Sequence, residues 1–368
     1  MSDVKDYYRH LHQIPEISGC EQETAEYIYN SLCDMGYSPN RIGKTGVYAD
    51  LTADKSLPWI LLRADIDALP IDEKSCATVV SRHNGVMHAC GHDSHTAMLL
   101  GAALSLRGKN IEQNIRFLFQ PAEETTEGAA EMIRCGIIPQ NLIACFAMHV
   151  WPGVKKGTVA TRTGALMASS DVYSIEIKGK SAHCAQSVLG ADALQTAVLI
   201  AASLAEIRAV ATDKDTILFC GSIASGNSHN IVPDKAKLSG TLRTFSETDR
   251  KNIKLMLEKT VKESAQKYGT EAQLNWYAGC PAIDNSEKII NELGGLVPDF
   301  VCDQPRTLAA EDFACYQKYA QGVMLWLGTG DTPPLHNESF FVPEDILPKG
   351  VSLWQKIALH NWTAVCGI

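Results

Sequence analysis

The sequence predicts an α/β protein of two domains, one with a mostly parallel central sheet flanked by helices and one with an antiparallel sheet. Its 368 residues exceed the size at which a single core stops growing, roughly 250–300 residues. Short apolar runs alternate with helical patterns towards both ends of the chain, which is typical of a parallel sheet. Residues 170–278 lack this alternation of strand and helix patterns, which favours a separate, inserted α+β domain.

The first 169 residues carry the alternation of strands and helices. Apolar residues at helical spacing predict a helix over residues 21–35, which Gly36 ends. Buried strands are expected over residues 59–67, 114–120 and 144–148, with helices over 97–104 and around 130–132. Strands joined through helices pair in parallel with right-handed crossovers, and sites in such sheets form beyond the carboxyl ends of the strands.

The middle segment predicts an inserted domain over residues 170–278, a normal size for a domain. Its strands are expected over residues 171–178, 216–223, 237–245 and 273–277, and its helices over 190–210 and 251–268. The larger domain then comprises residues 1–169 and 279–368, with another strand at 324–327. Because an antiparallel sheet leaves an edge strand that can pair with a second subunit, we expect a homodimer.

Composition excludes several classes of partner. The net charge of −9 disfavours nucleic acid and anionic membranes. No apolar run approaches the roughly 18 residues that span a bilayer, and the first residues lack the apolar core of a signal peptide. The 12 cysteines are scattered and include no CxxC pair, which indicates reduced thiols and a cytoplasmic protein.

Candidate metal ligands gather just before and at the start of a predicted helix. They are Cys90, His92, Asp93 and His95. Asp93 or Ser94 is the expected N-cap of this helix. The turn before it can direct the Cys90 thiolate and the His92 imidazole at one ion, although a buried thiol beside surface histidines is the alternative. In the metal-free protein, a Cys90 thiol at a helix amino terminus is expected to have a lowered pKa and to oxidise readily.

Further candidate ligands follow strand ends, namely Glu124, His149 and His336. Adjacent carboxylates at a strand end point in different directions. One of Glu123 and Glu124 can therefore bind metal while the other holds a water, unless the pair is an acidic surface loop. With Cys90 and His92 the ligands number five, which suits two ions about 3.5–4 Å apart. Thiolate, imidazole and carboxylate favour zinc, cobalt, nickel or manganese over calcium or magnesium.

Eight motifs, distributed almost end to end, give the chain a family resemblance. They are His12–Glu16, Arg63–Pro70, Met87–Asp93, Gln120–Glu124, Asn230–Asp234, Gly240–Arg243, Ala310–Phe313 and Leu335–Asn337. Through them the chain resembles the amidohydrolase branch of the two-metal aminoacylase and carboxypeptidase superfamily. That branch includes hippurate hydrolases, N-acetyldiaminopimelate deacetylases and hydrolases of auxin–amino-acid conjugates.

The resemblance implies roles for particular residues of the larger, catalytic domain. The metal ligands would be Cys90, His92, Glu124, His149 and His336. They would hold two divalent ions per subunit, with Cys90 as the bridging ligand. Glu123 would be the general base. Asp65, Asp93 and His95 are expected to support these ligands or to shape the turn.

The resemblance also implies that the inserted domain is a lid or dimerisation domain. In it, His183 would help to polarise the scissile carbonyl, often across a dimer interface, although on its own it would be interpreted as a surface residue. Asn230 and Arg243 would hold the substrate's carboxylate, for which a bidentate arginine is suited. Many relatives carry a Pro-His pair where this chain has Ser187-Val188, a departure that affects the expected acyl-group preference.

The expected function is a metal-dependent amidohydrolase that cleaves small N-acyl amino acids, such as acetyl or benzoyl derivatives, to a carboxylate and a free amino acid. The nearest alternative is a dipeptidase or carboxypeptidase, which has nearly the same residues. A non-catalytic binding protein on the same fold is a third possibility, against which the intact Glu123 and the full set of ligands argue.

Overall fold

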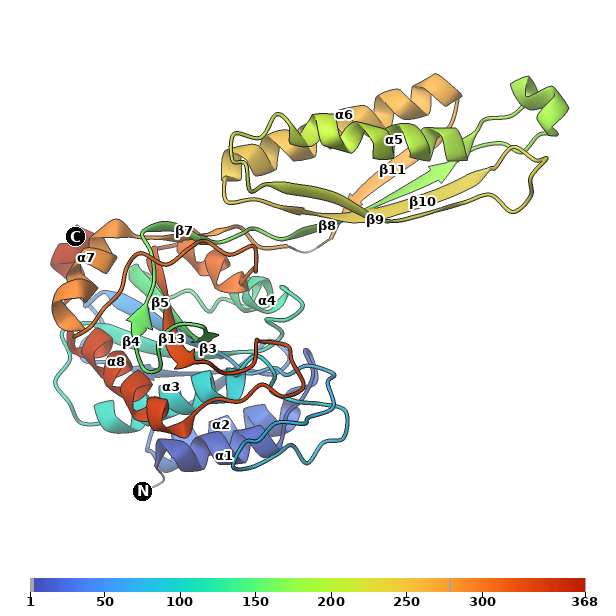
Figure 1. The fold of residues 1–368 in the computed structure, drawn as a ribbon. Helices are drawn as coiled ribbons and strands as arrows, with labels where there is room; N and C mark the ends of the chain where they lie inside the picture. Colours follow the sequence, from blue (N-terminus) through green and yellow to red (C-terminus); the bar gives the residue numbers. More distant parts are fainter. Residues whose placement is uncertain (1–2, 278, 368) are drawn as a thin grey trace. The chain divides into compact units, whose positions relative to one another are not determined.

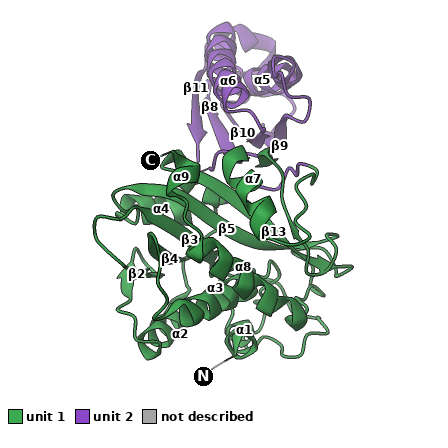
Figure 2. Cartoon of the chain, turned by 90° about the vertical axis from the view of Figure 1, so that its left-hand side faces the viewer, with its two compact units in different colours: residues 1–166, 283–305, 312–368 green, residues 167–282, 306–311 purple. Residues whose placement is uncertain are grey.

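The computed structural model describes residues 3–277 and 279–367, which divide into two compact units (Figure 2). Unit 1 comprises residues 1–166, 283–305 and 312–368, and unit 2 comprises residues 167–282 and 306–311. Residue 278, the expected end of the inserted domain, lies outside the described residues. Residues 306–311, which the sequence analysis assigned to the larger domain, group with unit 2.

The centre of unit 1 is a seven-stranded sheet with the order β1-β2-β4-β3-β5-β13-β6 (Figure 1). The strands are β1 Asn40–Ile42, β2 Gly46–Leu51, β3 Trp59–Asp65, β4 Asn114–Gln120, β5 Leu142–Pro152, β6 Val159–Ala160 and β13 Gln321–Gly330. The four central strands β4, β3, β5 and β13 are parallel, whereas β1, β2 and β6 pair antiparallel with their neighbours. The predicted mostly parallel sheet is therefore confirmed.

The parallel strands are buried along nearly their whole length because helices cover the sheet. The helices of unit 1 are α1 Val4–Gln13, α2 Gln22–Asp34, α3 His92–Leu106, α4 Gly128–Arg134, α7 Glu287–Leu296, α8 Leu347–Leu359 and α9 Thr363–Cys366. Short 3₁₀ turns are η2 Asp312–Lys318 and η3 Glu344–Ile346. Of the 15 residues of α3, 13 are buried, since α1 and α8 pack on the helix. Because α3 is packed in this way, its first residue is held in place at one end of the sheet.

The start of α3 differs from the expectation that Asp93 or Ser94 would cap it. The N-cap is Gly91, and His92 is already the first helical residue. Gly91 has a φ of 82°, a left-handed conformation that favours glycine. A Cβ atom at this position would lie 2.5 Å from Cγ2 of Val150. The tight approach to β5 therefore requires glycine and moves the helix start towards Cys90.

Unit 2 is an antiparallel sheet with helices on one face (Figure 1). Its four strands have the order β11-β8-β10-β9, with bounds β8 Asp171–Lys178, β9 Ile217–Ser225, β10 Lys235–Arg243 and β11 Glu271–Trp276. Helices α5 Ala193–Arg208 and α6 Glu247–Tyr268 bury Tyr173, Ile175 and Ile177 of β8. A 3₁₀ turn, η1, spans Cys184–Leu189. The short strands β7 Gly164–Met167 and β12 Ile283–Asn285, which belong to unit 1 except for Met167, pair with each other.

None of the described helices combines the length and the apolar character that a membrane span requires.

Candidate metal centre

The candidate centre lies at the carboxyl ends of β3, β4 and β5, as the topology predicts. Glu123 and Glu124 come three and four residues after Gln120, the last residue of β4. Ala122 has a φ of 56°, and its amide N–H donates to Oε1 of Glu21 at 3.0 Å. This anchored turn directs the two glutamates back towards the sheet end. His149 lies within β5 itself, in register with Trp326 of β13.

A turn and one backbone hydrogen bond bring the remaining candidates to the same place. The turn through Gly91 presents Cys90 beside the start of α3, and Cys90 is buried. The amide N–H of His336 donates to the carbonyl of Ala89 at 2.9 Å. His336 has a φ of 62°, which is uncommon for a residue with a side chain. A strained residue at this position indicates a site at which the side chain has to point in one direction.

The candidate ligand atoms form two groups that share Cys90. In one group, ligand atoms of Cys90, His92 and His149 all lie within 4.8 Å of one another, and in the other those of Cys90, Glu124 and His336 do. Cys90 Sγ lies 3.4 Å from Nε2 of His149. Nε2 of His336 lies 3.4 Å from Oε1 of Glu124. All five residues that the sequence predicted as ligands therefore meet in one part of unit 1.

Two buried atoms among these ligands have no hydrogen-bond partner among the described residues. They are Nε2 of His92 and Oε1 of Glu124, which lie 3.9 Å apart. Leaving a buried polar atom unpaired costs about 1–3 kcal/mol. A cation in each of the two groups that share Cys90 would give each of these atoms a partner, and the thiol, imidazole and carboxylate groups are suited to a transition metal. The residues present therefore fit two divalent cations.

Asp67 is a supporting residue that the sequence analysis did not identify. Nδ1 of His92 lies 2.9 Å from the carbonyl oxygen of Asp67 and 3.3 Å from its Oδ1. Oδ2 of Asp67 accepts from the Ser18 hydroxyl at 2.7 Å and from the amide of Glu124 at 3.0 Å. Asp67 thus fixes the orientation of one candidate ligand and the backbone of another, as carboxylates commonly do behind metal-binding histidines.

His95 is close to the site, but both of its ring nitrogens are engaged. Nδ1 lies 2.6 Å from Oδ1 of Asp65, and Nε2 accepts from the amide of Val150 at 2.9 Å. Arg63 pairs with Asp65 at 2.7 Å and with Asp312 at 2.8 Å. This buried network holds the ends of β3 and β5 together, so Asp65 and His95 support the site.

Neighbouring charges set the protonation of the metal-free centre. Burial lowers the pKa of His92, but the carboxylates of Asp65, Asp67 and Glu124 outweigh burial and raise that pKa to about 10. For His149, burial and the adjacent imidazoles hold the pKa well below its usual value. His149 is therefore neutral at pH 7, whereas His92 carries a proton that a metal would have to displace.

The expectation of a lowered Cys90 pKa is wrong. Burial and the carboxylates of Glu124, Glu123 and Asp65 raise the pKa of this thiol well above its usual value. These effects outweigh the partial positive charge of the helix amino terminus, which is worth at most about 2 kcal/mol. The metal-free thiol is therefore protonated and is not the reactive thiolate that the sequence suggested.

Glu123 is buried at the same end of the sheet. Its Oε2 lies 4.0 Å from Nε2 of His92, and ligand atoms of Glu123, His92 and Glu124 fall within 4.8 Å of one another. A carboxylate here is close enough to hold a water molecule against a cation bound to its neighbours.

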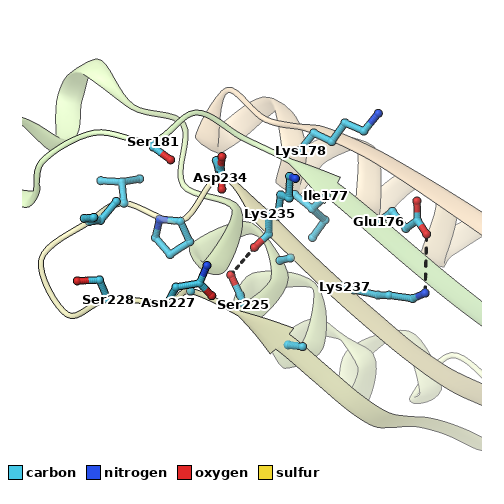
Figure 3. Close-up of a pocket in the computed structure, with 16 residues that line it drawn as sticks. Glu176, Ile177, Lys178, Ser181, Ser225, Asn227, Ser228, Asp234, Lys235 and Lys237 are labelled. Carbon is cyan, nitrogen blue, oxygen red and sulfur yellow. Dashed lines mark hydrogen bonds and ion pairs between the residues drawn. The ribbon is translucent and has the colours of Figure 1, made fainter.

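Two of the three candidate residues in unit 2 lie together at one end of its sheet. His183 forms an isolated bridge with Ile231, and the amide N–H of Cys184 donates to the carbonyl of Asn230 at 3.0 Å. Beside them, Ser181, Asn227 and Ser228 line a pocket of about 840 Å³ (Figure 3). His183 is exposed, and its Nδ1 accepts from the amide of Ala185 at 3.2 Å.

Arg243 lies at the opposite end of the same sheet. It is the last residue of β10, whose first residue, Lys235, follows Asn230 by five positions. At about 3.3 Å per residue, the two ends of this strand are roughly 26 Å apart. The Arg243 guanidinium donates to the carbonyl of Leu308 at 3.1 Å. Within one copy of unit 2, Arg243 therefore cannot act on the same small molecule as His183 and Asn230.

Comparison with known proteins identifies relatives along nearly the whole chain. The model of Peptidase family M20/M25/M40 matches residues 61–360. The chain is 38% identical to the N-acetyl-L-cysteine deacetylase of Bacillus subtilis, over 93% of this chain and 84% of that protein. It is 32% identical to thermostable carboxypeptidase 2 of Saccharolobus solfataricus, over 93% of this chain and 91% of that protein.

A solved structure has the same fold. The YxeP protein of Bacillus subtilis, described as a dinuclear metal-binding peptidase of the M20 family, aligns with a TM-score of 0.82 and 31% identity. The alignment covers 97% of this chain and 96% of that one.

Proposed function

This chain belongs to Peptidase family M20/M25/M40, and we propose that it is a metal-dependent amidohydrolase that cleaves N-acyl amino acids. One observation carries the proposal: Cys90 belongs to two groups of ligand atoms, and Glu123 is buried beside them. A hydrolytic site needs a bound cation and an adjacent base, and this arrangement offers both. The N-acetyl-L-cysteine deacetylase relative supports N-acyl amino acids as the substrate class.

Two divalent ions are proposed for the centre, one held by Cys90, His92 and His149 and the other by Cys90, Glu124 and His336. Zinc, manganese, cobalt and nickel are the candidates, because the ligand set combines thiolate, imidazole and carboxylate. When bound, such ions would polarise the scissile carbonyl and lower the pKa of water. Asp67 keeps Nε2 of His92 directed at the first position through the contact at Nδ1.

Glu123 acts as the general base in this proposal. It takes a proton from the attacking water and then delivers it to the nitrogen of the leaving amino acid, so the amide bond breaks without releasing an amide anion. The products are the carboxylate of the acyl group and a free amino acid. Burial of Glu123 keeps the carboxylate close to the sheet end, where the water has to lie.

His183, Asn230 and Arg243 would bind the substrate from unit 2, which we propose to be a lid and dimerisation domain. Since Arg243 lies about 26 Å along β10 from the end that carries His183 and Asn230, the two sets cannot serve one substrate from one chain. A homodimer resolves this conflict, because each site can take Arg243 from one chain and His183 with Asn230 from the other. The edge strand β9, on which the side chain of Phe219 is 58% exposed, supports pairing between copies.

A carboxypeptidase or dipeptidase activity is the second candidate, and the thermostable carboxypeptidase relative favours it. The two activities differ in the group on the acyl side of the scissile bond, which is uncharged in an N-acyl amino acid and carries an amine in a dipeptide. The substrates of either activity are small molecules. The net charge of −9 supports a cytoplasmic enzyme that does not bind nucleic acid or membranes.

A substrate panel tests the proposal. The metal-loaded protein is assayed with acetyl, benzoyl and aminoacyl derivatives of one amino acid, and the release of the free amino acid is measured. We expect higher kcat/KM for the acetyl or benzoyl derivative than for the dipeptide. Preference for the dipeptide would favour the second candidate, and turnover of no substrate would contradict both.

A further inference from the structure

The loop after β5, residues 297–299 and helix α8 line a cavity of about 450 Å³ in unit 1. None of its lining residues belongs to the candidate metal centre. Four lysines line it, namely Lys155, Lys156, Lys349 and Lys356. Among the described residues that line the cavity, Asp299 is the single carboxylate. This concentration of positive charge is unexpected in a chain whose net charge is −9.

Two of the lysines lie in the loop after β5 and two on α8, and most of them form no ion pair with an acidic residue. Lys156 pairs with Asp345 at 2.7 Å. Nζ of Lys356 donates to the carbonyl of Leu296 at 2.8 Å, and Nζ of Lys349 lies 3.5 Å from the carbonyl of Gly157. Within residues 3–277 and 279–367, Lys155, Lys349 and Lys356 form no ion pair within 4.0 Å, although the carboxylate of Asp345 also attracts Lys349. Each ammonium group has three donors, so several remain free for an anion.

The floor of the cavity strengthens the effect of these charges. Val159, Val297 and Leu353 line it and are buried, and a low-dielectric surface increases the attraction between nearby charges. The first turn of α8 also lines the cavity through Lys349.

We propose that this cavity binds a small organic molecule with two or more phosphate groups, of the kind represented by a nucleoside diphosphate. Lysines are suited to phosphate as point charges. The apolar floor would contact the uncharged part of the ligand, and the volume is in the range of small-molecule sites, about 300–1,000 Å³. The site does not depend on the proposed hydrolase activity, since it shares no residue with the metal centre.

Isothermal titration of the full-length, metal-loaded protein tests the site, with adenosine diphosphate as the probe. The variant is Lys155→Gln combined with Lys349→Gln. The matched control is Lys44→Gln combined with Lys318→Gln, which removes the same charge from exposed positions of unit 1 that do not line the cavity. Phosphates also chelate metal ions, but both variants retain that effect. Only the difference between them therefore reports on the cavity.

We expect the cavity variant to bind the probe at least roughly tenfold more weakly than the control, a difference of about 1.4 kcal/mol, because it lacks two of the four ammonium groups. At the same probe concentration, the melting temperature of the control should rise by more than that of the variant. Equal affinities in the two variants, or no binding to either, would overturn the proposal. Pyrophosphate and citrate are the comparison ligands. Weaker binding of pyrophosphate than of the probe supports the contact with the apolar floor, and tighter binding of citrate overturns the assignment to phosphate.

Discussion

Sγ of Cys90 lies 3.4 Å from Nε2 of His149, and the same Sγ lies within 4.8 Å of ligand atoms from Glu124 and His336. One sulfur atom therefore joins two groups of ligands that come from four separate segments of unit 1. A thiolate can bridge two cations, whereas the protonated thiol of the metal-free state cannot. The protonation of Cys90 thus links metal binding to pH.

Metal affinity should rise steeply with pH. Burial and the carboxylate of Glu124 raise the pKa of Cys90 well above its usual value. At His92 the nearby carboxylates outweigh the effect of burial and raise the pKa to about 10. Both groups are protonated at pH 7 and must lose their protons when they bind metal. If both protons are released, the dissociation constant should fall by up to about 100-fold per pH unit between pH 6 and 8.

Titration of the metal-free protein with zinc in the presence of a competing chelator, at pH 6, 7 and 8, measures this slope. Cys90→Ser is the informative variant, because it removes one of the two protons and should reduce the slope by about half. A dissociation constant independent of pH, after correction for the chelator, would contradict the protonation state assigned to the centre.

Glu123→Gln should retain metal and lose activity. General base catalysis contributes about 10²–10⁴-fold to the rate, so kcat should fall by this factor while the metal content by elemental analysis stays that of the wild type. Glu124→Gln is the matched control, which should lose metal at one position. An unchanged rate for Glu123→Gln would show that another group takes the proton, and loss of metal would show that Glu123 is a ligand.

The proposed exchange of residues between subunits predicts complementation. His183→Ala should be nearly inactive, since removing one donor to a developing oxyanion costs about 2.7–4 kcal/mol, and Glu123→Gln should be nearly inactive as well. Mixed under conditions that exchange subunits, the two variants form heterodimers in which one site has both residues intact. Each heterodimer should recover about half of the wild-type activity.

Differently tagged chains establish that heterodimers have formed. If they form and activity does not return, His183 acts within its own chain or has no catalytic part. The same experiment with Asn230→Ala in place of His183→Ala should give the same recovery, because the two residues lie at the same end of the unit 2 sheet.

His12 should make a contribution to the free energy of unfolding that depends on pH. Its Nδ1 lies 2.6 Å from Asp93 and its Nε2 3.0 Å from Glu73, and these three side chains are buried. Burial lowers the pKa of His12, but the two carboxylates outweigh it and raise the pKa to about 10 from 6.5. Because the folded-state pKa is the higher one, the stabilisation is complete below pH 6.5, declines between 6.5 and about 10, and is lost above that.

Urea unfolding of His12→Gln at pH 6, 8 and 10 tests this contribution. Removing one partner of a buried ion pair costs about 3–5 kcal/mol, so the free energy of unfolding should fall by that amount at pH 6 and by progressively less at higher pH. His10→Gln is the control, since His10 is exposed on the same helix. A loss that is constant with pH would show that His12 acts through packing and not through its charge.

Local patterns predicted the parts of the fold that carry strong periodic signals. Strand β4 begins at Asn114 and ends at Gln120 as expected, because its apolar run is continuous and Pro121 ends it. The short strands β1 and β2 were not predicted. They pair antiparallel across the turn between Ile42 and Gly46. Their mixed composition gives no clear strand pattern, and the register of β2 is set by its pairing with β4.

The grouping of the candidate ligands could be predicted where motifs mark them, whereas contacts between residues far apart in the sequence could not. The segments with Cys90, His92 and Glu124 carry recognisable spacing. Asp67 precedes His92 by 25 residues, and only the fold brings its carbonyl within 2.9 Å of Nδ1. The pKa of Cys90 was assigned the wrong direction for the same reason. The helix start is visible in the sequence, whereas the burial and the three nearby carboxylates are not.

Titration of activity with metal tests most directly whether two metal ions joined by Cys90 form the proposed hydrolase centre. The protein is stripped of metal, zinc or manganese is added in known amounts, and hydrolysis of an N-acetyl amino acid is measured at each addition. We predict no activity without metal and a maximum at two ions per chain, with the Cys90→Ser variant failing to reach that maximum. Full activity in the metal-free protein, or a Cys90→Ser variant with unchanged activity and stoichiometry, would contradict the account.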